Sequence, residues 1–414
     1  MNAWGPYRGP GGSQNAFGRL WWGRFGRKAW GMQIHGDCDP AFAPVREAFA
    51  VCFDDLGEVG AAVCVHVEDR KVLDLWGGFA DAEGARPWQR DTLVGFYSVG
   101  KPLAALCLLQ LIEQGRVELD APVCRWWPEY AAQGKQDTTV RQLMCHRAGL
   151  PACRRRLPEG AMLDWDLMTG ALAAERPWWE PGTAHAYHTN TYGFLVGELV
   201  RRCTGVSLGQ RFRCEIAEPL GADLGFGLAE SELARCAEIL FQPTGDALDP
   251  ALLDLPMSDE ERMIRHSYVN PSGLSGLGVM NTREWRMAEV PSTNGHGTAR
   301  GVSRVYAALA AGGELDGVRI LGPEMLREAA SPQSVGPCPI LEREVSFGLG
   351  FQQTRPERSF GPNPTSFGHF GTGGSVGFAD PDAGVGFGYL LNHITPRWQS
   401  PRNRILIDSL YECL

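Results

Sequence analysis

The sequence predicts an α+β protein: an antiparallel sheet flanked by helices, plus a mainly helical lobe inserted at about residues 121–290. Two β-rich runs lie before residue 80 and three more lie in the last hundred residues, whereas the middle of the chain has helical periodicity. Strands from both ends of a chain that enclose a helical segment favour an antiparallel sheet with helices packed on it. With 414 residues and 44% hydrophobic content, the chain is long enough to bury a large core.

Local signals set the bounds of the elements in the first third of the chain. A proline stands in the first turn of the first helix, and Glu68-Asp-Arg70 joins two β-rich runs as a hairpin. The next helix begins close to Ser98, because Pro102 has no N–H to donate and is tolerated only in a first turn. Gly115 ends this helix. The expected elements are a helix over residues 44–53, strands over 60–67 and 71–76, and a helix from about residue 98.

The rest of the chain is divided by glycine and proline and shows no internal repeat. A helix that starts at Thr139 ends at Gly149, with Pro151 beyond it. Residues 245–275 predict a long lid or rim loop. The remaining expected elements are helices over 192–200, 298–310 and 404–411, and strands over 346–351, 374–378 and 384–391.

Composition limits the partners and the compartment. The net charge is −9 and the longest basic run is Arg154-Arg-Arg156, so we expect no nucleic-acid partner. The twelve cysteines are scattered without a C-x-x-C pair, which is typical of reduced, mostly buried thiols in a cytoplasmic protein. No apolar stretch approaches the roughly 20 residues that cross a bilayer, so we expect no membrane partner. The oligomeric state is left open.

Residues 1–31 differ from everything that follows. They hold four tryptophans and no acidic residue. A signal peptide needs a continuous apolar region and a small-residue cleavage site, and neither is present. We therefore expect a disordered leader or an over-long translation start, with one folded domain over residues 32–414. A membrane-surface anchor is the less favoured alternative, because the tryptophans lack helical spacing.

Ser98 and Lys101 form the first candidate catalytic pair. Residues three apart on a helix lie on one face, one turn from each other. A serine hydroxyl is a poor nucleophile until a neighbouring group helps to remove its proton. The start of the helix also places Ser98 at the positive end of the helix dipole. Because S-x-x-K occurs by chance in many chains, this interpretation depends on the other segments.

Two further segments offer the groups that such chemistry needs. Tyr187 stands at a loop-to-helix junction after Pro181-Gly182, where a tyrosine can reach a cleft or simply pack the start of a helix. As a catalyst it is a phenol or phenolate whose pKa of about 10 is lowered by a nearby ammonium such as Lys101. Residues 367–378 are glycine-rich, which predicts either a turn or a strand edge that offers a backbone N–H to a developing oxyanion.

Two other patterns are weaker. Residues 373–377 match G-x-S-x-G around Ser375, but that motif needs an acid and a histidine later in the chain, and His393 is the only histidine left. His185 and His188 suggest a metal site, but no Asp, Glu or Cys joins them at ligand spacing. We therefore expect neither a metal nor a cofactor.

Taken together, four motifs resemble the serine β-lactamase and penicillin-binding-protein superfamily in order and spacing. They are F-x-S-x-x-K, T-V-R-Q-L-M-x-H-x-A-G-L-P, P-G-T-x-x-x-Y and H-x-G-x-G-G, and the similarity covers roughly residues 40–410. Within the superfamily the chain looks most like the β-lactamase-like carboxylesterases. The resemblance implies a β-lactamase/transpeptidase-like fold, with Ser98 as the nucleophile, Lys101 as its helix partner and Tyr187 as the general base.

The same resemblance assigns substrate-binding roles to the glycine-rich segment. His369, Phe370 and Gly371 stand where β-lactamases have Lys-Thr-Gly, which implies that His369 and Gly371 bind the substrate. The Thr372 N–H would join the Ser98 N–H in the oxyanion hole.

The chain departs from the family pattern at two positions. Thr189 stands where an asparagine is expected after Tyr187, although Asn190 is one residue further along. His369 replaces a lysine that helps to bind a substrate carboxylate, and a mostly neutral imidazole is a weaker carboxylate partner at pH 7. Both departures favour neutral esters over β-lactams and cell-wall peptides.

The expected activity is therefore hydrolysis of small carboxylic esters through a Ser98 acyl-enzyme. The alternatives are a β-lactamase, a D-amino-acid peptidase, or an acyltransferase that uses the same site. Weak β-lactamase activity is compatible with the ester assignment. A catalytically inactive scaffold is a further alternative, and the retention of Ser98, Lys101 and Tyr187 argues against it.

Overall fold

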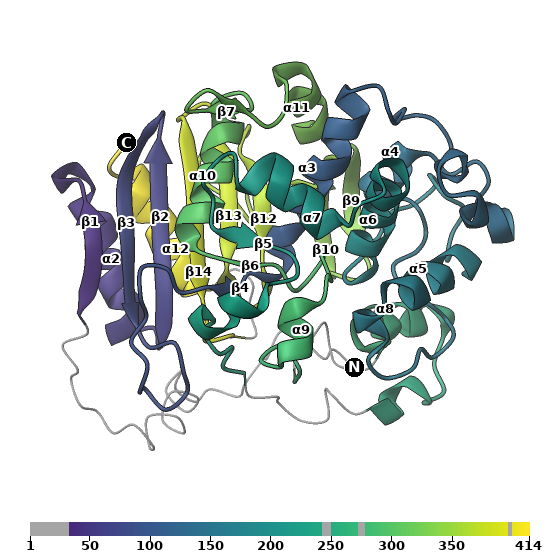
Figure 1. Ribbon diagram of the computed structural model, residues 1–414, viewed down its shortest axis with the longest axis horizontal. Helices are drawn as coiled ribbons and strands as arrows, with labels where there is room; N and C mark the ends of the chain where they lie inside the picture. The colour runs from purple at the N-terminus through teal and green to yellow at the C-terminus, as the bar shows by residue number, and fades with distance from the viewer. Residues whose placement is uncertain (1–32, 242–249, 272–277, 396–399) are drawn as a thin grey trace.

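A nine-stranded antiparallel sheet is the centre of the computed structural model, which describes residues 33–241, 250–271, 278–395 and 400–414 (Figure 1). Its strand order is β1-β3-β2-β14-β13-β12-β11-β10-β9. The strands are β1 (Ile34–Cys38), β2 (Gly60–Val67), β3 (Arg70–Gly78), β9 (Ser334–Cys338), β10 (Arg343–Phe347), β11 (Gln352–Gln353), β12 (Phe367–Phe370), β13 (Val376–Asp380) and β14 (Val385–Leu391).

The two ends of the chain meet in the middle of this sheet. Strand β14 pairs with β2 in antiparallel register, from Val385 opposite Val67 to Leu391 opposite Ala61. The hairpin of β2 and β3 turns at Glu68, which has a φ of +56°. The predicted antiparallel sheet built from both termini is confirmed, and it brings β12 and β13 into line with the N-terminal strands.

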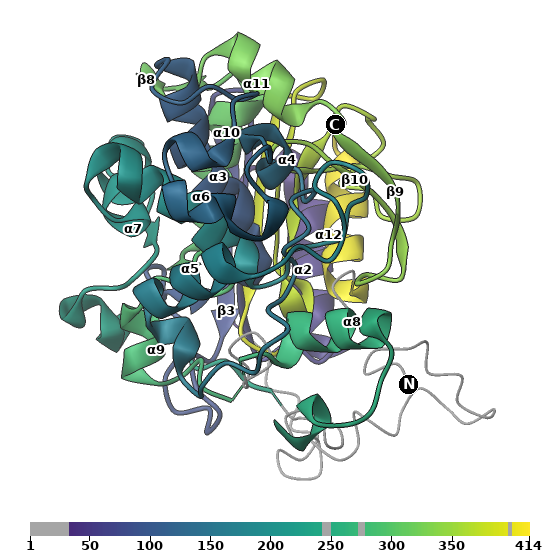
Figure 2. The same cartoon turned by 90° about the vertical axis from the view of Figure 1, so that its right-hand side faces the viewer.

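Helices cover both faces of the sheet. Helices α2 (Ala43–Asp54) and α12 (Pro401–Tyr411) pack together on one face, and α10 (Ala299–Ala310) crosses the other face over β14 and β2 (Figures 1 and 2). Glycines on β14 allow α10 to approach closely. A Cβ atom on Gly386 would lie 2.3 Å from the Ala307 nitrogen, and one on Gly388 would lie 2.4 Å from the Ala299 oxygen. The α/β interface is therefore backbone against backbone at these two positions.

Helix α3 (Gly100–Glu113) stands between the sheet and a helical lobe. Its residues from Gly100 to Ile112 are all buried, as its apolar composition predicts. One side contacts β12, and the other contacts α6 and α7. The other helices are α4 (Val140–Met144), α5 (Trp165–Ala174), α6 (Thr191–Thr204), α7 (Leu208–Phe212), α8 (Asp259–Val269), α9 (Arg283–Met287) and α11 (Pro323–Ala330).

A three-stranded sheet anchors the segment that leads into α3. Its strands, in the order β4-β6-β5, are β4 (Val94–Gly95), β6 (His296–Gly297) and β5 (Leu224–Gly225). The Phe96 N–H donates to the Gly295 carbonyl at 2.9 Å, immediately before the turn that carries Ser98. The short hairpin of β7 (Glu314–Leu315) and β8 (Val318–Arg319) lies beyond α10.

Three expectations were wrong in detail. The strand expected over residues 346–351 is instead a break between two strands, since β10 ends at Phe347 and β11 begins at Gln352. The helix from Thr139 ends at Met144 instead of Gly149, because His146 takes a left-handed backbone with a φ of +65°. Within the expected loop over 245–275, the described residues 250–271 contain helix α8, which Ser258 and Glu261 cap reciprocally. The remaining expectation for that loop, and the one for residues 1–31, lie outside the described residues.

Two compositional expectations can be compared with the structure. Among the described residues, no helix combines the length and the apolar character that crossing a bilayer requires. All twelve cysteines are free thiols, and seven of them are buried, in agreement with the predicted reduced state.

Candidate active site

The Ser98 side chain is positioned by a tight turn at the start of α3. Residues Tyr97–Val99 form one turn of 3-10 helix, and α3 continues from Gly100. Tyr97 has a φ of +50°, a left-handed backbone that costs a non-glycine residue roughly 1–2 kcal/mol. Such strain is concentrated at functional sites, where neighbouring structure holds it in place. Ser98 itself is 6% exposed.

Three predicted residues converge on one oxygen atom. Lys101 Nζ lies 3.0 Å from Ser98 Oγ, and the Tyr187 hydroxyl lies 2.9 Å from the same atom. Lys101 Nζ is also 4.8 Å from the centroid of the Tyr187 ring. The Ser98 hydroxyl therefore contacts two groups that can exchange its proton, each at hydrogen-bond distance.

Burial sets the charge of both partners. It lowers the pKa of Lys101 well below its ordinary 10.5, because the ammonium loses its hydration. It raises the pKa of Tyr187 above its ordinary 10.0, and the opposing positive charges of Arg358 and Arg343 are smaller effects. The expectation that an ammonium lowers the pKa of Tyr187 was therefore wrong in direction: the cost of burying a phenolate is larger. The favoured resting pair is a phenol beside an amine that gives up its proton readily.

Aromatic rings and one thiol fix the orientation of Tyr187. Its ring stacks on Phe347 at 5.8 Å and on His369 at 5.8 Å, with interplanar angles of 10° and 29°. Its backbone N–H donates to Cys338 Sγ at 3.3 Å. Phe347 and Cys338 come from β10 and β9, so the edge of the main sheet holds the phenol in place.

His369 lies beside Tyr187 but carries no charge suited to binding a carboxylate. Its ring is fully buried, and Nδ1 lies 2.6 Å from the Phe370 carbonyl. Because a carbonyl can only accept, Nδ1 carries the proton and Nε2 is the acceptor nitrogen. Burial, followed by the charge of Lys101, lowers the pKa of His369 well below 6.5. The imidazole is therefore neutral at pH 7.

Gly371 lets the end of β12 touch the Ser98 turn. A Cβ atom on Gly371 would lie 2.5 Å from the Phe96 oxygen and 3.4 Å from a methyl group of Val99. Its own N–H donates to the Ser375 carbonyl at 2.7 Å. Thr372 follows, half-buried, as the first residue of the 3-10 turn Thr372–Gly374. The segment that the resemblance assigns to the oxyanion hole thus directly abuts the segment that carries Ser98.

The substituted Tyr-x-Asn element has a structural use. Asn190 lies at the start of α6 and donates through Nδ2 to the Ser267 carbonyl of α8 at 3.1 Å. Thr189, the residue before Asn190, is buried. Asn190 therefore joins two helices of the lobe.

The residues of the G-x-S-x-G motif and of the histidine pair do not form a catalytic arrangement. Ser375 lies between antiparallel strands β12 and β13, whereas a nucleophile elbow needs a turn from a strand into a helix. His393 Nδ1 contacts the Gly57 carbonyl at 2.7 Å. His188 bonds backbone groups through both ring nitrogens, to Ala186 and Leu150. No cluster of three His, Cys, Asp or Glu side chains within the described residues could hold a metal ion.

Ser292, which no sequence pattern predicts, completes the surroundings of Lys101. Its carbonyl accepts from Lys101 Nζ at 3.0 Å, and its hydroxyl accepts from the Gly193 N–H at 2.6 Å. The contact to the amine is a backbone carbonyl, which no residue type encodes. Cys338 and Phe347 were missed for a similar reason, because their roles depend on which strands are neighbours.

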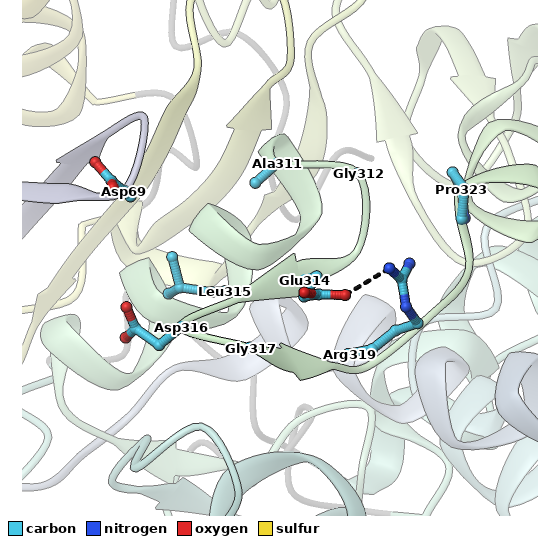
Figure 3. Close-up of a pocket in the computed structure, with 9 residues that line it drawn as sticks. All are labelled: Asp69, Ala311, Gly312, Glu314, Leu315, Asp316, Gly317, Arg319 and Pro323. Atoms are coloured by element: carbon cyan, nitrogen blue, oxygen red, sulfur yellow. Dashed lines mark ion pairs between the residues drawn. The ribbon is translucent and has the colours of Figure 1, made fainter.

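A hollow of about 430 Å³ lies elsewhere on the surface, beside the β7–β8 hairpin (Figure 3). None of the residues that line it belongs to the group around Ser98. Figure 3 shows its acidic side chains and the ion pair between Glu314 and Arg319. The lining residues are Asp69, Ala311, Gly312, Glu314, Leu315, Asp316, Gly317, Arg319 and Pro323.

The fold and the buried serine define the class of protein, a serine hydrolase of β-lactamase/transpeptidase-like fold. The family model described as Beta-lactamase matches residues 45–412, so the chain belongs to the beta-lactamase family. The match covers every strand of the main sheet except β1 and includes every candidate residue of the site.

Similar proteins carry both esterase and β-lactamase names. The chain is 34% identical to the esterase/beta-lactamase LipL of Mycobacterium tuberculosis, over 88% of this chain and 84% of that protein. It is 41% identical to a family VIII carboxylesterase of known structure, with a TM-score of 0.81, over 92% of this chain and all of the other. A penicillin-binding-protein homologue from Caulobacter crescentus has 36% identity and a TM-score of 0.84, over 92% and 100% of the two chains.

Proposed function

We propose that the protein hydrolyses small carboxylic esters through an acyl-enzyme on Ser98, with Lys101 and Tyr187 as the base system and no cofactor. The observation that carries the proposal is the position of Ser98 Oγ, 3.0 Å from the Lys101 amine and 2.9 Å from the Tyr187 hydroxyl. A serine between two buried proton-transfer groups is the arrangement that nucleophilic catalysis requires.

The favoured protonation states give a complete proton path. The neutral Lys101 amine takes the proton of Ser98 as Oγ attacks the ester carbonyl, and the N–H groups of Ser98 and Thr372 stabilise the oxyanion. The Tyr187 phenol then protonates the leaving alcohol oxygen as the C–O bond breaks. The resulting phenolate regains a proton from the Lys101 ammonium beside its ring. Water follows the same path in reverse and releases the acid.

The neutral side chain of His369 supports neutral esters as the preferred substrates. A β-lactam or peptide carboxylate needs a permanent positive charge where β-lactamases have lysine, and here His369 is buried and neutral. The similarity to a family VIII carboxylesterase and to the esterase/beta-lactamase LipL supports the same substrate class. The free thiols support the predicted cytoplasmic location.

A panel of p-nitrophenyl esters of increasing acyl length, assayed beside nitrocefin and a D-alanyl peptide, tests the proposal. We expect short esters to be turned over much faster than nitrocefin at pH 7, and Ser98→Ala to abolish turnover with unchanged circular dichroism. Faster hydrolysis of nitrocefin or the peptide would contradict the ester assignment. Ester turnover by Ser98→Ala would contradict the mechanism.

A further inference from the structure

His146 has a backbone conformation that few residues other than glycine adopt. It follows α4 in the left-handed region, with a φ of +65°, and the Arg147 N–H bonds back to the Gln142 carbonyl at 2.8 Å. This is the Schellman ending of a helix, in which the left-handed residue is usually glycine. A non-glycine residue there is strained by roughly 1–2 kcal/mol. The strain indicates that the histidine side chain has a use at this position.

The ring of His146 lies against Tyr187 inside the protein. It is 1% exposed, and its centroid lies 5.2 Å from the Tyr187 ring and 4.6 Å from the Phe347 ring. The Tyr192 ring, at 4.7 Å, forms another side of the same contact. Tyr187 is therefore supported by His146 as well as by the two rings on which it stacks.

His146 accepts two hydrogen bonds, one from each side of Tyr187 in the chain. The His146 carbonyl accepts from the Ala186 N–H at 3.3 Å, one residue before Tyr187. The His146 ring nitrogen Nδ1 accepts from the His188 N–H at 3.2 Å, one residue after it. A single residue thus holds the peptide on both sides of the catalytic phenol.

The second hydrogen bond depends on a neutral ring. A backbone N–H can only donate, so Nδ1 must be unprotonated. Burial lowers the pKa of His146 well below 6.5, and positive charge on His188 or Lys101 acts in the same direction. The left-handed backbone of His146, its ring contacts and its acceptor nitrogen therefore all help to fix the position of Tyr187.

We propose that His146 is a positioning residue that holds the Tyr187 hydroxyl in line with Ser98 Oγ, by accepting the His188 N–H while its ring supports the phenol. The inference rests on the proposed function, since it assumes that Tyr187 moves the proton. It gives a role to the T-V-R-Q-L-M-x-H-x-A-G-L-P segment, in which His146 is the histidine. The alternative is that His146 only fills the core.

Three substitutions separate these roles. His146→Asn keeps an acceptor oxygen near the place of Nδ1 and tolerates a left-handed backbone. His146→Gly also tolerates that backbone but removes both the acceptor and the ring. His146→Phe keeps a ring and leaves the His188 N–H without its acceptor. The matched control is His66→Asn, because His66 is likewise buried and hydrogen-bonded, to Ser303 at 2.8 Å, far along the sheet from Tyr187.

The measurement is kcat/KM for p-nitrophenyl acetate in each variant, alone and combined with Tyr187→Phe. We expect His146→Phe and His146→Gly to lose roughly ten- to a hundredfold, as for a displaced catalytic group. His146→Asn should recover most of that loss, and His66→Asn should keep the wild-type value. In the Tyr187→Phe background, His146→Phe should add no more than about a twofold loss, because the two residues act as one device.

Each other outcome overturns a specific statement. Equal losses in His146→Asn and His146→Gly, or losses that multiply with Tyr187→Phe, would assign His146 to general packing. Wild-type activity in all three His146 variants would do the same. If Tyr187→Phe alone keeps wild-type kcat/KM, the proposed function fails first, and the role of His146 fails with it. If His146→Phe does not fold, the Asn and Gly variants make the same comparison, because both fit the native backbone.

Discussion

Gly371→Ala tests how closely the end of β12 must approach the Ser98 turn. The backbone of Gly371 lies in the extended region, with a φ of −101°, which alanine adopts without strain. The effect of the substitution therefore depends only on the space around the new Cβ atom. The new Cβ would lie 2.5 Å from the Phe96 oxygen. Restoring an ordinary contact of 3.4 Å requires the two segments to separate by about 0.9 Å.

That separation has a calculable effect on catalysis. Thr372 follows Gly371, so its N–H would move away from the carbonyl oxygen of a substrate bound at Ser98. Losing one oxyanion donor, or misplacing a reacting group by about 1 Å, lowers the rate on the order of a hundredfold. This corresponds to about 2.7 kcal/mol of transition-state stabilisation. We therefore expect kcat/KM for p-nitrophenyl acetate to fall about a hundredfold, with slower labelling of Ser98 by a fluorophosphonate.

The matched control is Gly170→Ala. Gly170 is exposed in α5, and a Cβ there would meet nothing within 4 Å. We expect unchanged kinetics and a gain in stability of roughly 0.5–1 kcal/mol, since alanine is the better helix former. Wild-type activity in Gly371→Ala would refute the claim that β12 and the Ser98 turn together form the oxyanion site.

Four further results are expected. Lys101→Met and Tyr187→Phe should each lower kcat/KM by several decades and the double variant by little more; multiplied losses would show two separate proton paths. The acid limb of the pH profile should report protonation of Lys101, so activity persists well below pH 10.5 and is lost as pH falls through the lowered pKa of this group; a limb near 10.5 would contradict a buried amine. His369→Lys should raise the nitrocefin-to-ester ratio, and an unchanged ratio would show that this position does not set the preference. Arg402→Met should lower the free energy of unfolding in urea by about 3–5 kcal/mol, because it leaves the fully buried Glu58 carboxylate, 2.7 Å away, without its ion-pair partner. A change below about 1 kcal/mol would mean that water reaches this ion pair.

Elements with strong local signals could be predicted from the sequence. The hairpin of β2 and β3, helix α3 with its glycine stop, and α10 each lie within a few residues of the predicted bounds. Strand β1 was missed because its sequence, Ile-His-Gly-Asp-Cys, is polar, and only pairing with β3 makes it a strand. Helix α8 was missed although Ser258 and Glu261 form a capping box at its start. The proline and aspartate residues around this capping box favoured a loop.

The candidate site likewise contains residues that local sequence signals predict and contacts that they do not predict. Ser98 and Lys101 are encoded by helical spacing, and Tyr187 by its motif, so residue types were enough to select them. The direction of the Tyr187 pKa shift was not predictable, because it depends on a degree of burial that arises only once β9, β10 and His146 pack around the residue. The carbonyl of Ser292 and the bracket formed by His146 are contacts between distant segments, and no local pattern encodes them.

The acyl-enzyme itself is the most direct test of the central claim. The wild-type protein is mixed with p-nitrophenyl acetate, quenched in acid within the pre-steady-state burst, digested and analysed by mass spectrometry. We predict an acetyl group on the peptide that contains Ser98, with none in Ser98→Ala under the same conditions. An acetyl group on the peptide that contains Ser375, or ester turnover without any serine adduct, would contradict a Ser98 acyl-enzyme.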